Sequence, residues 1–93
     1  MGKYIKGRTH TPIWAVSRLE DSARGTSMCT MGAGLTWDVA VRYVDLKYYL
    51  EHGYIVEHEI IRKGETSEWI LRASNGDSVI FVLNICALMH TEL

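Results

Sequence analysis

The sequence is poor in cysteine and has no long apolar run. Its two cysteines, Cys29 and Cys86, lie far apart and fit no Cys-x-x-Cys or Cys/His spacing, which argues against a disulfide framework and against zinc. The longest apolar run, Val79 to Met89, is interrupted by Asn84 and is shorter than the roughly 18 residues of a membrane-spanning helix. We therefore expect a small cytoplasmic protein. If a phage encodes the chain, this would be the cytoplasm of the phage's host.

The chain also has little net charge, but its charges are unevenly distributed. The formal net charge is −1, yet residues 1–24 hold five basic against two acidic residues, and residues 38–93 hold five basic against nine acidic residues. A nucleic-acid-binding domain usually has a stronger basic excess. Residues 1–11 are expected to form a basic, flexible arm. If the chain is instead a small nucleic-acid-binding regulator, the residues in contact would be Lys3, Tyr4, Lys6, Arg8 and His10.

Residues 36–53 carry a start signal, a period and a stop signal that all favour one long helix. Thr36 can accept a hydrogen bond from a free amide of the first turn, and Gly53 can adopt the left-handed conformation that ends a helix. At about 100° per residue the apolar side chains fall on two stripes. The first stripe contains Trp37, Ala40, Val41, Val44 and Tyr48 and is predicted to pack on a sheet through all of these except Ala40. The second stripe contains Val39, Tyr43, Leu46 and Leu50.

The rest of the chain predicts strands. Residues 12–19 have the β-branched and aromatic content of a strand, whereas residues 20–35 are rich in serine, threonine and glycine and are predicted to be a loop, with at most a short strand at 27–31. Residues 54–85 alternate with a period of two and predict a three-stranded antiparallel meander. Residues 84–93 lose the β-branched bias and predict a helical turn or a frayed tail. The expected fold is a single α+β domain of N-terminal strand and loop, then one long helix packed on the meander.

Turn signals predict the register of the meander. Asn75-Gly76 favours a two-residue hairpin turn, which would set Leu71 opposite Ile80 and Trp69 opposite Val82. For the preceding hairpin, a four-residue loop at 63–66 is preferred and pairs Glu57 with Arg72, while a tight turn at 63–64 would set Glu59 opposite Glu68. The core face would then hold Tyr54, Val56, His58, Ile60, Trp69, Leu71, Ile80 and Val82, and the opposite face Ile55, Ile61, Ile70, Phe81 and Leu83 among charged residues.

Two apolar areas are left over in this scheme, namely the second helix stripe and the opposite sheet face. The N-terminal third of the chain can hardly cover both, so one of them should meet another chain, as a homodimer or with a protein partner of unknown identity. Aromatic residues and arginine carry most interface energy. The predicted partner-binding residues are Arg42, Tyr43, Leu46, Tyr49, Leu50, Arg62, Ile70, Arg72 and Phe81.

Motifs that carry chemistry are weak. Glu57, Glu59 and Glu68 could hold a cation, but no Asp/Asn-rich loop accompanies them, and a solvated acidic strip is the simpler interpretation. Residues 32–34 form a Gly-Ala-Gly turn before the helix, but Trp37 occupies the position where a dinucleotide-binding motif needs its third glycine. One cysteine and one histidine, Cys29 and His10, do not make a catalytic pair. We predict no catalytic residue, metal or cofactor.

These observations favour a non-enzymatic protein-binding module that acts stoichiometrically as an inhibitor or adaptor. Small inhibitors of host machinery encoded by phages or other mobile elements would have this character. The alternatives are the nucleic-acid-binding regulator with a basic arm, and a small-ligand binder at the Gly32–Gly34 loop.

Overall fold

The computed structural model describes the backbone of residues 9–90 and the side chains of residues 12–86. Five strands form one antiparallel sheet: β1 (Thr9–Ser22), β2 (Gly25–Gly34), β3 (Tyr54–Ile60), β4 (Ser67–Ala73) and β5 (Ser78–His90). Their order across the sheet is β2-β1-β5-β4-β3. Three short helical pieces, α1 (Trp37–Ala40), η1 (Val41–Tyr43) and α2 (Leu46–Glu51), carry the chain from one edge of the sheet to the other.

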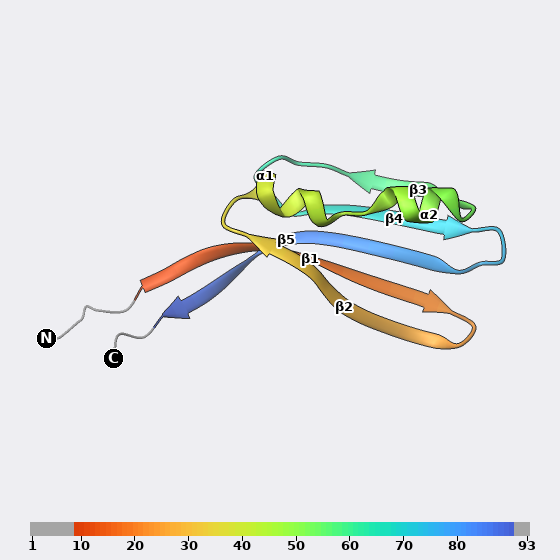
Figure 1. Ribbon diagram of the computed structural model, residues 1–93, viewed down its shortest axis with the longest axis horizontal. Coiled ribbons are helices and arrows are strands. Elements are labelled where there is room, and N and C mark those ends of the chain that lie inside the picture. Colours follow the sequence, from red (N-terminus) through yellow and green to blue (C-terminus); the bar gives the residue numbers. More distant parts are fainter. Residues whose placement is uncertain (1–8, 91–93) are drawn as a thin grey trace, which may run out of the picture.

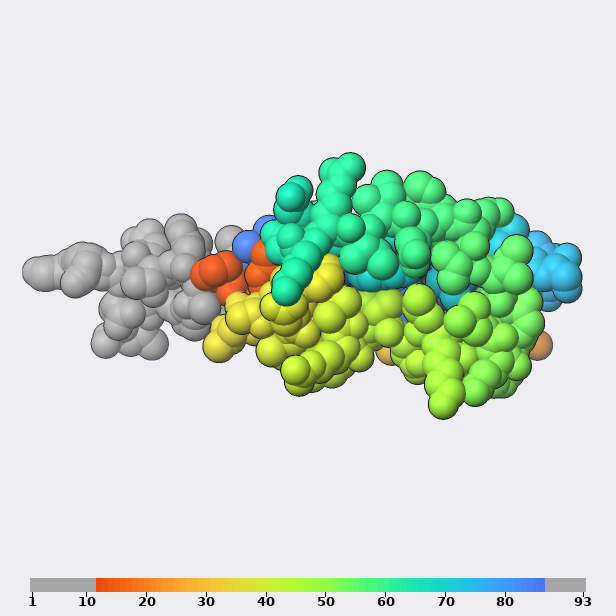
Figure 2. All heavy atoms as spheres, turned by 90° about the horizontal axis from the view of Figure 1, so that it is seen from above, coloured from red at the N-terminus to blue at the C-terminus, as the bar shows by residue number. Residues whose placement is uncertain are grey.

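The helical pieces all lie on the same side of the sheet (Figure 1). Figure 2 shows them as a yellow-green layer along one side of the molecule. We call this side of the sheet the helix-covered face and the other side the open face. Within residues 9–90, no helix or loop forms a layer on the open face.

The predicted fold, a long helix on a three-stranded meander, is wrong, because the N-terminal third adds two strands to the sheet. β1 extends the predicted strand of residues 12–19 at both ends, and β2 occupies most of the predicted loop of residues 20–35. The two strands form a hairpin whose turn includes Gly25, at a φ of 122°. β5 continues to His90, where a helical turn or a frayed tail was expected. Pairing with β1 explains this, since Thr9–Ile13 are partners of the last five residues of β5.

The helix of residues 36–53 has the predicted ends but is broken inside. Thr36 accepts a hydrogen bond from the Val39 amide at 3.2 Å, and Gly53 has a φ of 89°. Between them, Val44 is extended, and Asp45 caps a new helix by accepting from the Tyr48 amide at 3.5 Å. An aspartate whose side chain bonds a nearby backbone amide competes with continuation of the helix, and β-branched valines have a low propensity for the helix interior. The break changes which side chains face the sheet, so that Tyr49 is 6% exposed and Tyr48 is 53% exposed.

The β4–β5 register differs from the prediction by one residue. Ala73 and Asp77 pair around a three-residue turn in which Gly76 has a φ of 96°, so Trp69 lies opposite Phe81 and Leu71 opposite Val79. A shift of one residue exchanges the two faces of a strand. Phe81 and Leu83 are therefore fully buried on the helix-covered face, and Ile80 and Val82, which were predicted to be in the core, lie on the open face.

The β3–β4 register matches a predicted loop only in part, because a bulge at Glu57 interrupts it. The pairs before the bulge are those that the tight turn at 63–64 would give, and the pairs after it belong to neither predicted loop. Val56 lies opposite Leu71 before the bulge, and His58 lies opposite Ile70 after it. The bulge moves His58 and Ile60 off the predicted core face. Glu57 still reaches Arg72, with a distance of 2.9 Å between the carboxylate and Nε, although the two residues are not direct partners in the ladder.

The core lies between the helical pieces and the middle strands. Its buried apolar residues are Val16, Ala40, Tyr49, Trp69, Leu71, Val79, Phe81 and Leu83, with Trp37, Val41, Val44 and Leu46 packed at its border. Two glycines of β2 allow the helical pieces to approach. A Cβ at Gly32 would lie 2.3 Å from the Tyr43 ring, and a Cβ at Gly34 would lie 2.5 Å from Val39. These glycines serve packing within a strand, so the turn predicted at residues 32–34 does not exist.

Candidate protein-binding surface

The centre of the open face is apolar where a solvent-facing sheet would be polar, and polar residues such as Ser17, Glu68 and Arg72 surround it. Antiparallel sheets with one wet face alternate apolar and polar residues, whereas strands buried on both faces have continuous apolar runs. In β5 the run Val79–Leu83 is apolar throughout. Val79, Phe81 and Leu83 fill the core, so Ile80 and Val82 point to the open face and remain partly exposed. The composition of β5 is that of a strand covered on both sides.

Cross-strand pairing joins the apolar side chains of the open face into a patch. Leu19 is the partner of Ile80, and Ile80 is the partner of Ile70 on its other side. Met28 extends this row onto the edge strand β2, because it pairs with Leu19, and it is 73% exposed. Val82 lies two residues further along β5, in the next row of the same face. We define the open-face patch as Leu19, Met28, Ile70, Ile80 and Val82.

Charged groups border the patch on the β3–β4 side, and they are paired within the chain. Arg72 Nε lies 2.9 Å from the Glu57 carboxylate, and this hydrogen bond and charge raise the pKa of the guanidinium. His58 Nε2 lies 3.8 Å from the Glu68 carboxylate. An apolar centre with a polar border is the usual anatomy of a protein interface. Arg72 and Glu57 are partners within the chain, and so are His58 and Glu68, so covering the patch would leave none of these four side chains without a partner.

The helix-covered face holds a group of interacting polar side chains, centred on Glu20. The Tyr49 hydroxyl donates to Glu20 Oε2 at 2.6 Å, and Arg18 Nε lies 3.7 Å from the same oxygen. Burial, and then the hydrogen bond to Glu20, raise the pKa of the Tyr49 hydroxyl. Arg18 Nη2 also donates to Cys29 Sγ at 3.2 Å. A hollow of about 290 Å³ lies beside these residues. The group links α2 to β1 and β2, which gives it a clear structural role.

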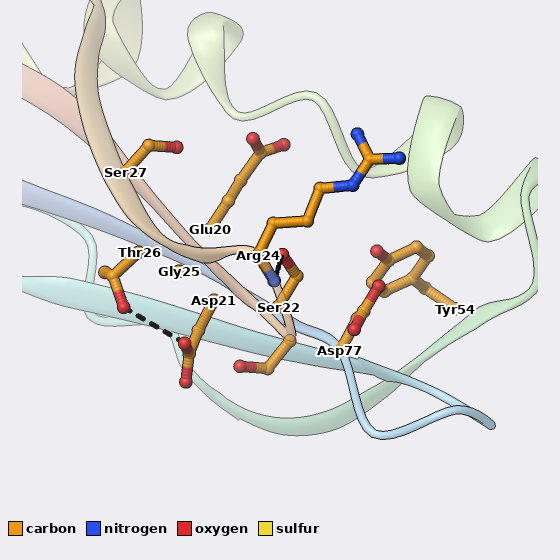
Figure 3. A pocket seen from close by; sticks show the side chains of 10 residues that line it. Glu20, Asp21, Ser22, Arg24, Gly25, Thr26, Ser27, Tyr54 and Asp77 are labelled. Atoms are coloured by element: carbon orange, nitrogen blue, oxygen red, sulfur yellow. Dashed lines mark hydrogen bonds between the residues drawn. The ribbon is translucent and has the colours of Figure 1, made fainter.

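A wider cleft of about 400 Å³ lies at the turn end of the β1–β2 hairpin (Figure 3). Its walls are polar, and several of their groups are bonded to one another: Thr26 Oγ1 donates to Asp21 at 3.0 Å, and the Arg24 amide donates to Ser22 Oγ at 3.1 Å. Burial and the nearby Asp77 raise the pKa of Tyr54 at the far wall. The cleft is open to solvent and combines three carboxylates with one guanidinium, a mixture that does not define a ligand.

The nine predicted partner-binding residues do not form one surface. Phe81, Tyr49 and Leu46 were placed at an interface by the wrong register and the unbroken helix, but Phe81 and Tyr49 are buried and Leu46 packs at the core border. The other six are accessible but divided. Tyr43 and Leu50 lie on the helix side at 43% and 48% exposure, Arg42 and Arg62 are exposed, and Ile70 and Arg72 belong to the open face.

The structure describes only part of the residues predicted to bind nucleic acid. Lys3, Tyr4, Lys6 and Arg8 lie outside the described residues, and of His10 only the backbone, in β1, is described. The backbone nevertheless rules out a pair of His10 and Cys29: Cys29 lies opposite Arg18, eight residues further along β1 than His10, which separates the two by roughly 27 Å. In the described part of the chain, no group of three His, Cys, Asp or Glu side chains could hold a metal ion.

Leu19, Met28, Ile80 and Val82 were missing from the predicted interface residues. The uninterrupted apolar run of β5 was the available signal, since such a run indicates a strand covered on both faces.

No family model, curated protein or solved structure matches this chain. No helix in residues 9–90 is long and apolar enough to cross a membrane.

Proposed function

We propose that this chain is a non-enzymatic, cytoplasmic module that binds another protein stoichiometrically through the open-face patch. The observation that carries the proposal is the uncovered apolar side of β5 and its neighbours. Burying such surface is the main favourable term in protein association. A partner that covers the patch would bury Ile80 and Val82 as completely as their neighbours Val79 and Phe81 are buried by the helical pieces.

The size of the open face suits a specific interface. Strands about 4.8 Å apart and residues about 3.4 Å apart give five strands of about seven residues a face of roughly 24 by 24 Å. This is roughly 550 Å² on each partner, or about 1,100 Å² in total, near the lower limit for a specific complex. The partner should present a flat or gently curved apolar surface with polar groups opposite the Arg72–Glu57 border. An inhibitor or adaptor would act in this way.

Affinity capture from a host lysate, with and without nuclease, tests the proposal when two matched variants are compared with the wild type. Ile80→Arg places a charge in the open-face patch, and Leu50→Arg places the same charge at an exposed site on the helix side. We expect a nuclease-resistant protein partner that is lost with Ile80→Arg and retained with Leu50→Arg. Circular dichroism of both variants confirms that they are folded. Loss with Leu50→Arg alone would move the interface to the helix side, and capture abolished by nuclease would favour the nucleic-acid alternative.

Self-association is part of the proposal, but neither predicted dimer surface is intact. The stripe of Tyr43, Leu46 and Leu50 loses Leu46 to the core border, and the sheet face of Ile70 and Phe81 loses Phe81 to the core. A second copy therefore needs a different surface.

A further inference from the structure

The two edges of the sheet are protected to very different degrees. An edge strand exposes unpaired amides and carbonyls, and proteins usually blunt such edges with charges, proline, bulges or short length. β3, at one edge, is seven residues long, carries Glu57, His58 and Glu59, and has a bulge at Glu57. β2, at the other edge, is ten residues long and has neither a charged residue nor a proline.

The unprotected part of β2 is the half nearest the hairpin turn. Residues 25–30 are all exposed, and within residues 9–90 only β1 pairs with β2. A bulge at Met31 and the overlying Tyr43 and Val39 limit access beyond this point. A regular stretch from Thr26 to Thr30 is left, with its outer backbone groups available to another strand.

The sequence of this stretch is nearly symmetric about Met28. Thr26 and Thr30 lie two residues to either side of it, on the open face, and Ser27 and Cys29, which have nearly the same shape, flank it on the helix-covered face. In an antiparallel pair related by a twofold axis, residues equally distant from the axis lie opposite one another. An axis at Met28 would pair Thr26 with Thr30 of a second copy and Ser27 with its Cys29. No like charges would meet, and threonine pairs across strands are favourable.

We infer that two copies of this chain associate by antiparallel pairing of their β2 strands about an axis at Met28. The pairing extends each five-stranded sheet into one of ten strands and brings the open-face patches of both copies onto one continuous surface. Because only about five residues of each strand pair, the interface is smaller than that of a permanent dimer, and we expect dissociation in the micromolar range.

Charge complementation at Met28 tests the inference. Sedimentation equilibrium of the wild type should show a dimer fraction that rises with concentration. Met28→Lys and Met28→Glu should each be monomeric, because like charges would face each other across the axis, and an equimolar mixture of the two should recover dimers. Ile55→Lys is the matched control, since Ile55 is 66% exposed on the opposite edge strand, and it should dimerise like the wild type.

A disulfide trap distinguishes this dimer from one formed by stacked open faces. In a Cys86→Ser background, Ser27→Cys should give disulfide-linked dimers with Cys29 of the second copy under oxidised glutathione, because opposite residues in antiparallel strands meet the geometric requirement. Glu59→Cys on β3 should not. A wild type that stays monomeric at high micromolar concentration, or a Lys/Glu mixture that stays monomeric, overturns the inference. Neither result affects the partner capture that depends on Ile80. A monomer would leave the β2 edge available to an extended segment of a foreign protein.

Discussion

Replacing Tyr49 by phenylalanine tests how the helical segment is fixed to the sheet. Tyr49 is 6% exposed, and its ring packs edge-on against Tyr54 and Phe81 with centroids 5.2 and 5.8 Å away. Phenylalanine keeps this packing and removes only the hydroxyl that donates to Glu20. Hydrogen bonds to charged groups contribute about 1.5–3 kcal/mol, but the half-exposed Glu20 carboxylate can rehydrate, so we expect a loss of about 1–2 kcal/mol in the free energy of unfolding.

Tyr48→Phe is the matched control, because Tyr48 precedes Tyr49 and is 53% exposed. Urea unfolding followed by circular dichroism should show a change within about 0.5 kcal/mol for this variant, as for most surface substitutions. An unbroken helix would place Tyr48 on the sheet and would reverse the order of the two losses. Equal losses, or a larger loss for Tyr48→Phe, would refute the arrangement of α2 described above.

The pH dependence of stability gives a second measure of the same contact. Burial and the bond to Glu20 raise the pKa of the Tyr49 hydroxyl in the folded state, whereas an unfolded tyrosine titrates near about 10. Above that pH the folded chain holds a proton that the unfolded chain has lost, so stability should fall as pH rises, by up to about 1.4 kcal/mol per pH unit. Tyr54 contributes in the same direction. The diagnostic result is therefore a shallower fall for Tyr49→Phe than for the wild type.

Two further stability predictions test the register and the glycine contacts. Val79→Ala should lower the free energy of unfolding by about 1–3 kcal/mol, and Ile80→Ala should lower it clearly less, because only Val79 lies in the core. Urea unfolding at a concentration where the chain is monomeric checks this. The reverse order would favour the predicted register with its two-residue turn. Gly32→Ala should lower the free energy of unfolding by about 1–3 kcal/mol, since its Cβ would meet the Tyr43 ring. The double variant with Tyr43→Ala should lose less than the sum of the two single losses. Additive losses would contradict the contact.

Local signals in the sequence predicted the boundaries of elements better than their connections. Thr36 and Gly53 mark the ends of the helical segment as expected, because a cap and a left-handed glycine act on their immediate neighbours. The break at Asp45 was missed, because a helix interior and an internal cap have the same apolar spacing around them. β2 was missed because strand propensity is weak in a stretch of small residues, and its pairing with β1 is decided by tertiary contacts.

The candidate surface was only partly predictable for a related reason. Ile70 and Arg72 were predicted to face a partner, and they lie on the open face. Phe81 was exchanged with Ile80 because Asn75-Gly76 fits both a two-residue turn and the last two positions of the observed three-residue turn, Ser74–Gly76. A one-residue difference in loop length transfers every side chain of β5 to the other face. Surplus apolar surface was therefore predictable, but its location was not.

Footprinting of the captured complex tests the central claim most directly. Carbene labelling, read out residue by residue by mass spectrometry, should fall at Leu19, Ile70 and Ile80 when the partner is bound, while Tyr48 and Leu50 on the helix side keep the labelling of the free chain. Protection at Tyr48 and Leu50 with unchanged labelling of the open-face patch would contradict the account.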